Sequence, residues 1–195
     1  HSHISHLFAL LEMAKLQGLN KVYVHAFLDG RDVGPQTADV YLAELDAEMK
    51  RIGVGKIATV AGRYYAMDRD KRWERVQKAY DAMVLHDGTV CTDAVSGVRA
   101  SYAGGVTDEF VVPFIAAPEA DSCVKAGDGM IFFNFSSKSL YTKSFSGFAF
   151  STGLSNLSIF LTSFSTSRTL SFSSNIFCAT MYCFSLSSIL IIALA

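Results

Sequence analysis

The chain has 195 residues, and its 17 Lys and Arg residues almost balance its 18 Asp and Glu residues, for a formal net charge of −1. This balance excludes a strongly basic nucleic-acid-binding protein and an acidic disordered tail. Half of the residues are hydrophobic and 18% are charged, against about 25% charged residues in an ordinary soluble domain. The length allows one domain or slightly more.

The apolar surplus lies at the C-terminal end. Residues 136–195 contain 17 Ser, 8 Phe and three cations but no Asp or Glu, so every acidic residue lies in residues 1–135. We interpret residues 1–135 as a partial domain and residues 136–195 as a low-complexity apolar tail that forms no domain. Codons for Glu, Lys and Arg read on the complementary strand give Phe, Leu and Ser. We therefore expect the tail to be an antisense or frame-shifted reading.

The two ends of the chain and its cysteines indicate the cellular compartment of the protein. Residues 169–195 carry no charge and are long enough to span a bilayer, but Ser and Thr interrupt most of this run, which disfavours a membrane anchor. The four cysteines form no Cys-x-x-Cys pair, a pattern that favours a reducing, cytoplasmic compartment. The chain starts without Met and without the features of a signal peptide. We expect it to be a piece of a longer protein.

Helices and strands alternate through the first 135 residues. Apolar spacing and turn residues predict helix 5–17, strand 21–28, helix 37–52, strand 56–61, helix 71–85, short helix 96–102 and strand 130–135. We expect Val40, Leu42, Leu45 and Met49 to form the apolar stripe of the second helix, and Trp73 to point inward from the third. The alternation predicts an α/β fold with a largely parallel sheet and flanking helices.

Polar loops follow the first two predicted strands, at residues 29–35 and 62–70. Because parallel strands end at the same edge of a sheet, the charged residues of both loops should converge there. The second loop carries Arg63 and Arg69, and the first carries Arg31. Guanidinium groups that converge in this way suit a phosphate or carboxylate ligand, because they bind such groups through paired, charge-assisted hydrogen bonds.

Two interpretations of these loops stay open on spacing alone. In the first, the arginines bind an anion and Asp32 holds or deprotonates a substrate hydroxyl. In the second, Asp32 is a turn former, and Arg63 and Arg69 pair with nearby acids on an exposed helix start, namely Asp68, Asp70 and Glu74. The second is the more economical interpretation, because charged loops are common on protein surfaces.

Other catalytic signatures are weak in this sequence. His1, His3 and His6 have a spacing like that of metal ligands, but no Cys or carboxylate accompanies them, so a zinc site is disfavoured. The sequence has no Gly-x-Gly-x-x-Gly after a predicted strand and no Gly-x-Ser-x-Gly elbow. The residues alone therefore indicate an anion-binding α/β module without a visible nucleophile.

Four long strings carry a more specific signal. They are HSHISHLFALL at 1–11, VYVHAFLDGRD at 22–32, GKIATVAGRYYAMDRDKRW at 55–73 and SYAGGVTDEF at 101–110. Together they closely resemble the cofactor-independent (2,3-bisphosphoglycerate-independent) phosphoglycerate mutases, and the resemblance covers residues 1–135. It implies a glycolytic enzyme of the alkaline-phosphatase superfamily, of which this chain is part of the inserted, substrate-binding domain.

The resemblance also implies an activity and a site. Such an enzyme interconverts 3-phosphoglycerate and 2-phosphoglycerate through a phosphoserine beside two manganese ions, and the serine and the manganese ligands lie outside this chain. His1, Arg31, Asp32, Arg63 and Arg69 fall on substrate-binding positions, with Asp32, aided by His1, in the catalytic proton transfer. The expected partner is the small-molecule substrate phosphoglycerate, without nucleic acid or membrane, and the intact family enzyme is expected to be a cytoplasmic monomer.

The sequence also departs from the family pattern. The family continues into an Arg-Pro-Asp-Arg motif, whereas Ser136-Ser-Lys-Ser139 stands here, so two further substrate arginines are missing. Gly34 replaces the usual proline of the first loop. An alternative function therefore stays open, namely a non-catalytic anion-binding module, with or without a membrane tether formed by its tail.

Overall fold

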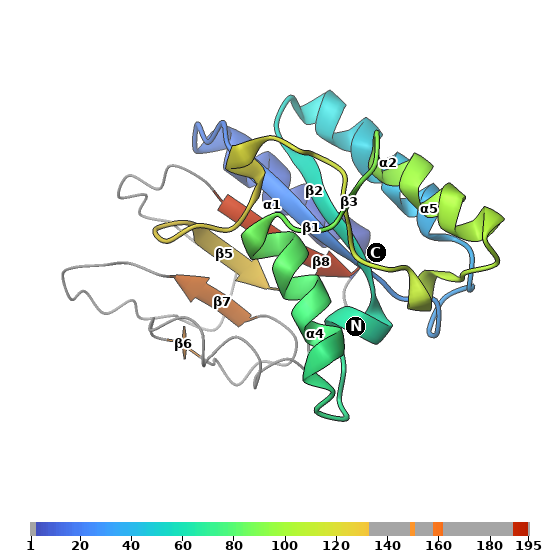
Figure 1. Cartoon of the computed structure of the whole chain (residues 1–195). Coiled ribbons are helices and arrows are strands. Elements are labelled where there is room, and N and C mark those ends of the chain that lie inside the picture. Colours follow the sequence, from blue (N-terminus) through green and yellow to red (C-terminus); the bar gives the residue numbers. More distant parts are fainter. Residues whose placement is uncertain (1–2, 133–148, 151–157, 162–188, 195) are drawn as a thin grey trace.

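The computed structural model describes residues 3–132, 149–150, 158–161 and 189–194. In this part of the chain an eight-stranded sheet lies between helices (Figure 1). The strands are β1 (Val22–Leu28), β2 (Lys56–Gly62), β3 (Thr89–Val90), β4 (Phe114–Ile115), β5 (Gly129–Phe132), β6 (Ala149–Phe150), β7 (Ser158–Leu161) and β8 (Ile189–Leu194). The α-helices are α1 (Ile4–Leu16), α2 (Ala38–Ile52), α3 (Arg63–Ala66), α4 (Trp73–Tyr80) and α5 (Ala94–Ala103). Shorter turns of helix are η1 (Asp81–Leu85), η2 (Asp108–Phe110) and η3 (Ala120–Ser122).

The strand order is β3-β4-β2-β1-β8-β5-β7-β6. Strands β2, β1, β8 and β5 run parallel to one another, whereas β4 is antiparallel to β2, and β7 is antiparallel to both β5 and β6. The predicted α/β fold with a largely parallel sheet and flanking helices is confirmed. The two-residue strands β3 and β4 were not predicted, because they are too short to show a period.

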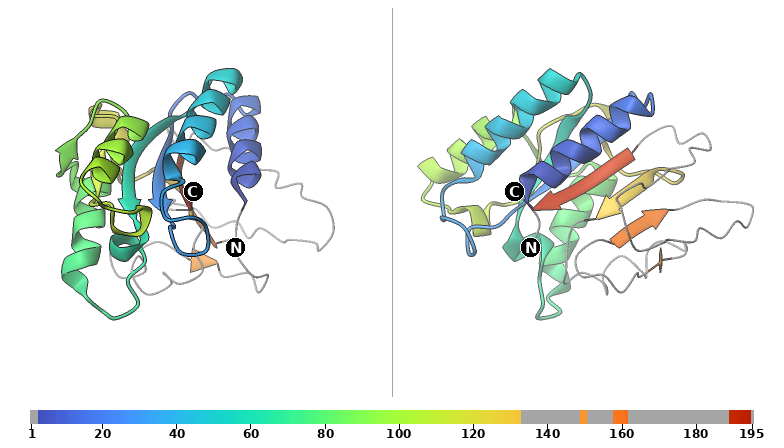
Figure 2. Two further views of the ribbon diagram at one scale, coloured as in Figure 1. Left: turned by 90° about the vertical axis from the view of Figure 1, so that its right-hand side faces the viewer. Right: turned by 180° about the vertical axis from the view of Figure 1, so that it is seen from behind.

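Strand β1 is buried on both faces, which explains its unbroken apolar sequence. On one face Val24 and Ala26 join a core cluster with α1, α2 and α5. In the right panel of Figure 2, α1 and α2 lie in front of the sheet, and α5 packs beside α2. On the other face Tyr23 and Phe27 join a second cluster with α3, α4 and η1. The sheet is therefore the central layer between two groups of helices.

Two predicted core positions are wrong. Val40 is 64% exposed and Trp73 is 53% exposed. Successive helix residues turn by about 100°, so Val40 lies almost opposite Leu42, and Trp73 lies well off the face that buries Ala79. The buried stripe of α2 consists of Ala38, Leu42, Leu45 and Met49.

Part of the tail takes part in the sheet. Three short strands are described in residues 136–195, and β8 runs parallel between β1 and β5. Its continuous apolar sequence lacks the alternation that reveals a half-exposed strand, and such runs are typical of strands inside a parallel sheet. None of the described helices is both long and apolar enough to cross a membrane.

Candidate anion-binding site

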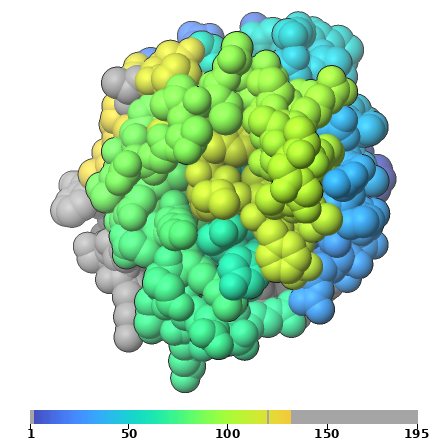
Figure 3. All heavy atoms as spheres, turned by 45° about the vertical axis from the view of Figure 1, so that its right-hand side comes forward, coloured from blue at the N-terminus to red at the C-terminus, as the bar shows by residue number. Residues whose placement is uncertain are grey.

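The two predicted loops leave the sheet side by side. In the parallel register of β1 and β2, Leu28 pairs with Gly62, so Asp29 and Arg63 begin their segments at the same edge of the sheet. The second loop was predicted to be irregular throughout, but its first residues form the single-turn helix α3. Figure 3 shows this face of the molecule, where the teal surface around α3 lies between the green and the yellow-green surfaces of later segments.

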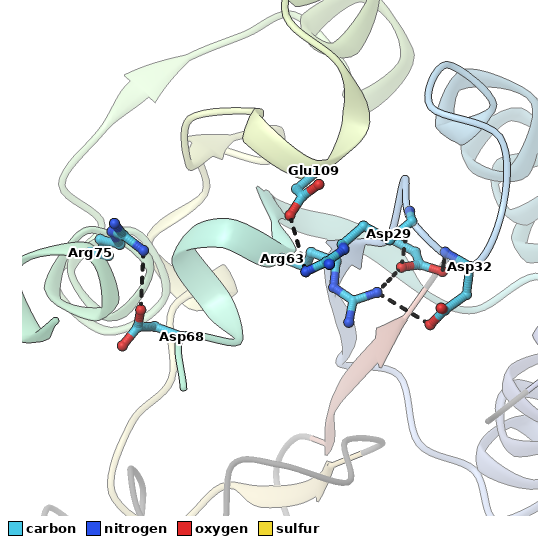
Figure 4. Close-up of polar contacts among 7 residues, drawn as sticks. Asp29, Asp32, Arg63, Asp68, Arg75 and Glu109 are labelled. Atoms are coloured by element: carbon cyan, nitrogen blue, oxygen red, sulfur yellow. Dashed lines mark hydrogen bonds and ion pairs between the residues drawn. The ribbon is translucent and has the colours of Figure 1, made fainter. Parts of the chain in front are cut away.

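Arg63 connects the two loops. Its Nη1 donates a hydrogen bond to Oδ1 of Asp29 and lies 3.3 Å from Oδ2 of Asp32 (Figure 4). The side chains of Arg63 and Asp29 are only 13% and 8% exposed. Burial by itself lowers the pKa of Arg63, but the hydrogen bonds and charges of Asp29 and Asp32 outweigh it and raise the pKa above its ordinary value. Arg63 therefore stays a cation.

The anchoring of Arg63 leaves part of its guanidinium available. Only Nη1 is bonded to the two carboxylates, and Nε and Nη2 have no hydrogen-bond partner among the described residues. Neither atom is among the buried polar atoms that lack a partner. Nε and Nη2 form the edge through which an arginine binds a carboxylate or phosphate with two parallel bonds. The geometry thus presents a held cation to an anionic ligand.

Asp29 shapes the first loop as well as holding Arg63. Its carboxylate accepts hydrogen bonds from the backbone N–H groups of Arg31, at 3.4 Å, and of Asp32, at 3.2 Å. Between them Gly30 has φ +69°, a conformation that glycine adopts without strain. This turn directs Asp32 toward Arg63, and the Asp32 side chain is 58% exposed. Asp32 therefore lies where a ligand hydroxyl can reach it.

The remaining candidate residues have no hydrogen bond or ion pair with the Asp32–Arg63 pair in the part of the chain that the structure describes. The guanidinium of Arg31 lies 3.8 Å from the carboxylate of Glu109 and is 64% exposed. Arg69 lies in the exposed segment after α3 and has no ion pair with any described residue. His1 lies outside the described residues. The structure thus brings Asp32 and Arg63 together and puts Arg31 at the same edge. Among these described residues, Arg69 has no hydrogen bond or ion pair with the other three.

A third segment completes the edge. The backbone N–H of Gly62 donates to the carbonyl of Val111 at 2.9 Å. A Cβ atom at Gly62 would lie 2.7 Å from Val111 N, and one at Gly30 would lie 2.7 Å from Glu109 N. Both glycines are therefore required by the close approach of the segment around η2. This packing explains why Glu109 faces Arg31.

Asp108 ties the same segment to α2. Its buried carboxylate accepts hydrogen bonds from the backbone N–H groups of Thr37, at 2.9 Å, and Ala38, at 3.1 Å, and from the hydroxyl of Tyr102. Burial raises the pKa of Tyr102, and the hydrogen bond to Asp108 raises it further. The carboxylate satisfies the N–H of Thr37 at the start of α2, and it shares the N–H of Ala38 with the Tyr102 hydroxyl.

The ion pairs of Arg63 differ from those that the second interpretation predicted. Arg63 pairs with Asp29 and Asp32 from the other loop, and Asp68 pairs with Arg75 at 3.3 Å. The pairing of Arg63 with Asp68 on an exposed helix start is therefore wrong. Sequence reasoning missed Asp29 and Glu109 as neighbours of the arginines. The position of Asp29 directly after a buried strand was the available signal.

The described residues contain no group of three or more His, Cys, Asp or Glu side chains that could hold a metal ion. The acidic residues at the site edge face Arg63 and Arg31 instead. These residues do not fit a manganese site, and the expected pair of manganese ions stays a prediction.

Comparison with known proteins shows which family the chain belongs to. Residues 1–145 match the family described as BPG-independent PGAM N-terminus (iPGM_N). The chain belongs to this family. The resemblance predicted from the four sequence strings is therefore confirmed.

Individual members of the mutase family give the extent of the match. The chain is 58% identical over 135 residues to the 2,3-bisphosphoglycerate-independent phosphoglycerate mutase of Staphylococcus aureus (strain MRSA252), covering 69% of this chain and 26% of that protein. It is 56% identical over 137 residues to the enzyme of the same name from Clostridium perfringens (strain SM101 / Type A), covering 69% and 27%. The chain thus spans about a quarter of the length of these curated relatives.

A solved mutase structure shares the fold. A chain described under "Crystal structures of Leishmania mexicana phosphoglycerate mutase at low cobalt concentration" superposes with a TM-score of 0.61 at 29% sequence identity. The match covers 67% of this chain and 26% of that chain. The α/β arrangement described above is therefore shared with a phosphoglycerate mutase.

Proposed function

We propose that this chain is the substrate-holding part of a 2,3-bisphosphoglycerate-independent phosphoglycerate mutase, an isomerase that interconverts 3-phosphoglycerate and 2-phosphoglycerate. Membership of the mutase family supports the proposal. The observation that carries it is the state of Arg63, which is anchored through Nη1 by Asp29 and Asp32 while Nε and Nη2 stay available. A fixed cation with a free bidentate edge suits the carboxylate or phosphate of phosphoglycerate.

The other site residues take roles that follow from their positions. Arg31 is exposed beside Glu109, and with Arg69 it adds positive charge for the second anionic group of the substrate. Asp32 holds, accepts or returns the proton of the hydroxyl that gains or loses the phosphoryl group, and His1 assists it. Holding the glycerate in one orientation is a large part of such catalysis, because the transferred group needs mainly positioning and cationic stabilisation.

We further propose that the intact enzyme is a cytoplasmic monomer, and that its nucleophile and its two manganese ions are held by parts of the enzyme other than the residues described here. When bound, such metal ions would activate the nucleophile and stabilise phosphoryl charge. The described residues would contribute the orientation of the glycerate and the handling of its hydroxyl proton. We therefore expect this chain to bind phosphoglycerate without turning it over.

Titration of the 195-residue chain with 3-phosphoglycerate, followed by amide NMR shifts, tests the proposal. We expect a dissociation constant of about 1 mM or weaker, because Ser136 and Ser139 stand where the resemblance calls for arginines, and each lost charge-assisted contact costs roughly 1.5–3 kcal/mol. Arg63→Gln should abolish measurable binding. Arg99→Gln, which removes an exposed arginine paired with Asp39 on the α2–α5 side, should leave it unchanged.

Two outcomes would contradict the proposal. Equal affinity for inorganic phosphate and for 3-phosphoglycerate would favour a general anion-binding module, because a mutase site must also recognise the carboxylate and the hydroxyl. Absence of any binding at 50-fold the expected constant, about 50 mM by the same estimate, would remove the assignment of the substrate to this edge.

A further inference from the structure

The single-turn helix α3 needs support from outside itself. It has four residues and no side-chain hydrogen bond at its N-cap, Gly62, and so short a helix is not stable alone. It nevertheless begins with Arg63, whose direction determines the candidate site. The question is what holds α3 in place.

Tyr64 supplies one side of that support. Its ring lies 5.2 Å from the ring of Phe110 in η2, tilted by 55°, and 5.2 Å from the ring of Tyr65, edge to face. The guanidinium carbon of Arg75 lies 3.9 Å from the centre of the same ring. The Tyr64 ring thus contacts both a cation from α4 and an aromatic ring from η2, and both contacts are attractive.

Arg75 has a second contact, which extends to the segment that carries Arg69. Its Nη1 lies 3.3 Å from Oδ1 of Asp68, as Figure 4 shows, and the Asp68 side chain is only 2% exposed. Oδ2 of Asp68 accepts hydrogen bonds from the backbone N–H groups of Asp70, at 3.1 Å, and Arg72, at 2.8 Å. Asp68, next to Arg69 in the chain, therefore fixes the backbone that follows Arg69.

We propose that Arg75 is a positioning residue for the candidate site, because its guanidinium ties Tyr64, beside Arg63, to Asp68, beside Arg69. This inference rests on the proposed function, since its consequence is for the binding of phosphoglycerate. Arg75 itself is not one of the residues that we assign to contact with the ligand. It holds the backbone of two ligand-facing arginines against α4, so that both keep one arrangement in the free protein and the ordering cost on binding is small.

The planar guanidinium is suited to this double role. One nitrogen of an arginine can bond a carboxylate while the face of the group stacks on a ring, whereas a lysine ammonium is a compact charge without such a face. The Arg75 side chain is 20% exposed, so water competes little for either contact. Tyr64 needs only its ring for this function.

The experiment compares four variants of the 195-residue chain. Arg75→Gln and Tyr64→Leu remove the two halves of the stacked pair, Tyr64→Phe keeps the ring, and Arg99→Gln is the matched loss of an exposed, paired arginine. Two amides report the arrangement without any ligand. Met67 N–H donates to the Arg63 carbonyl at 2.8 Å and closes α3, and Arg72 N–H donates to Asp68.

We expect hydrogen exchange at both amides to be about tenfold faster in Arg75→Gln, because opening of the segment costs less. The dissociation constant for 3-phosphoglycerate should rise about tenfold, or 1.4 kcal/mol. Tyr64→Leu should speed exchange at Met67 and weaken binding similarly. Tyr64→Phe and Arg99→Gln should match the parent in both measurements. Circular dichroism melting verifies that each variant is folded. If Arg75→Gln does not fold, the comparison of Tyr64→Leu with Tyr64→Phe decides the test.

The outcomes separate this inference from the proposed function. If the parent chain binds phosphoglycerate and Arg75→Gln binds it equally well, the positioning role is overturned and the proposed function stands. If Tyr64→Phe weakens binding as much as Tyr64→Leu, the hydroxyl matters rather than the stacked ring, and the inference is overturned. If the parent does not bind phosphoglycerate at all, the proposed function falls, whereas unchanged exchange at Met67 and Arg72 in Arg75→Gln overturns the inference by itself.

Discussion

The carboxylate of Asp29 bonds the guanidinium of Arg63, although 34 residues separate them in the chain. Asp29 follows β1 and Arg63 follows β2, and the parallel register of these strands brings the two residues to one edge of the sheet. The pair is nearly buried. It therefore links the architecture of the sheet directly to the direction of the arginine that we assign to substrate binding.

Asp29→Asn should lower the free energy of unfolding by about 2–4 kcal/mol, because it leaves a nearly buried guanidinium without its main counter-charge. Urea denaturation at neutral pH measures this loss. Asp46→Asn is the matched control, since Asp46 pairs with Lys50 on the exposed face of α2 and such pairs contribute about 0.5 kcal/mol or less. Equal losses in the two variants would contradict the assignment of the Asp29 pair as buried and structural.

Gly62→Ala should destabilise the protein by about 3 kcal/mol, because the new methyl group would collide with backbone atoms that cannot move independently. A Cβ at this position would lie 2.7 Å from Asp108 O and Val111 N, and closer still to Glu109 O. Gly88→Ala is the control, since the nearest atom to its Cβ would be at 3.6 Å. Thermal melting of both variants checks the difference, and a Gly62→Ala protein as stable as Gly88→Ala would refute the close approach.

His25 should make the protein sensitive to mild acid. Burial lowers the pKa of His25 to about 3, with a smaller contribution from the charge of His86, against 6.5 for a free imidazole. The unfolded chain therefore binds this proton at a higher pH than the folded chain does. The stability contribution is complete above pH 6.5 and is lost progressively as the pH falls toward 3.

Between pH 7 and pH 5 this single group should reduce the free energy of unfolding by about 2 kcal/mol. In His25→Met the decrease over the same interval should be smaller by that amount, whatever the variant's stability at pH 7. His25 also bonds Thr59 through Nδ1 at 2.8 Å, so the variant should be less stable at pH 7. Urea titrations at the two pH values provide the comparison, and a decrease as large in His25→Met as in the parent would assign the acid sensitivity elsewhere.

Tyr102→Phe should cost about 1–2 kcal/mol, because the Tyr102 hydroxyl donates to the buried Asp108 carboxylate and accepts from Ala38 N–H at 3.1 Å. Tyr41→Phe on α2 is the comparison, since its hydroxyl has no hydrogen bond to the part of the chain that is described. Chemical denaturation of both variants gives the values. A neutral Tyr102→Phe substitution would show that Thr37 and Ala38 satisfy Asp108 without the hydroxyl.

Local patterns were enough to predict β1, β2 and the main helices, because each has a long apolar period and clear end signals. Parallel crossovers then predict that Arg31, Asp32 and Arg63 lie at one edge of the sheet. The partners of those residues could not be predicted in the same way. Asp29 and Glu109 meet the arginines through tertiary packing, and only the position of Asp29 directly after a buried strand gave a signal of this in the sequence.

The other wrong predictions concern which face of a helix is buried. Val40 and Trp73 are large and apolar, and size was given more weight than angular position. The small residue Ala38 occupies the buried face of α2 in place of Val40, because α2 packs closely there beside the hydroxyl of Tyr102. A strict count of the turn per residue would have corrected both positions.

The packing of η2 against Gly30 and Gly62 has a consequence for the order of events during folding. All of the candidate arginines lie before residue 70, yet the edge they form is completed by a segment 38 or more residues after Arg69, beginning at Thr107. A nascent chain or proteolytic piece that stops short of Thr107 would hold every one of those cations without a ligand-ready arrangement. The capacity to bind should therefore emerge abruptly, when the last of three distant segments docks, and not in proportion to the length of chain made.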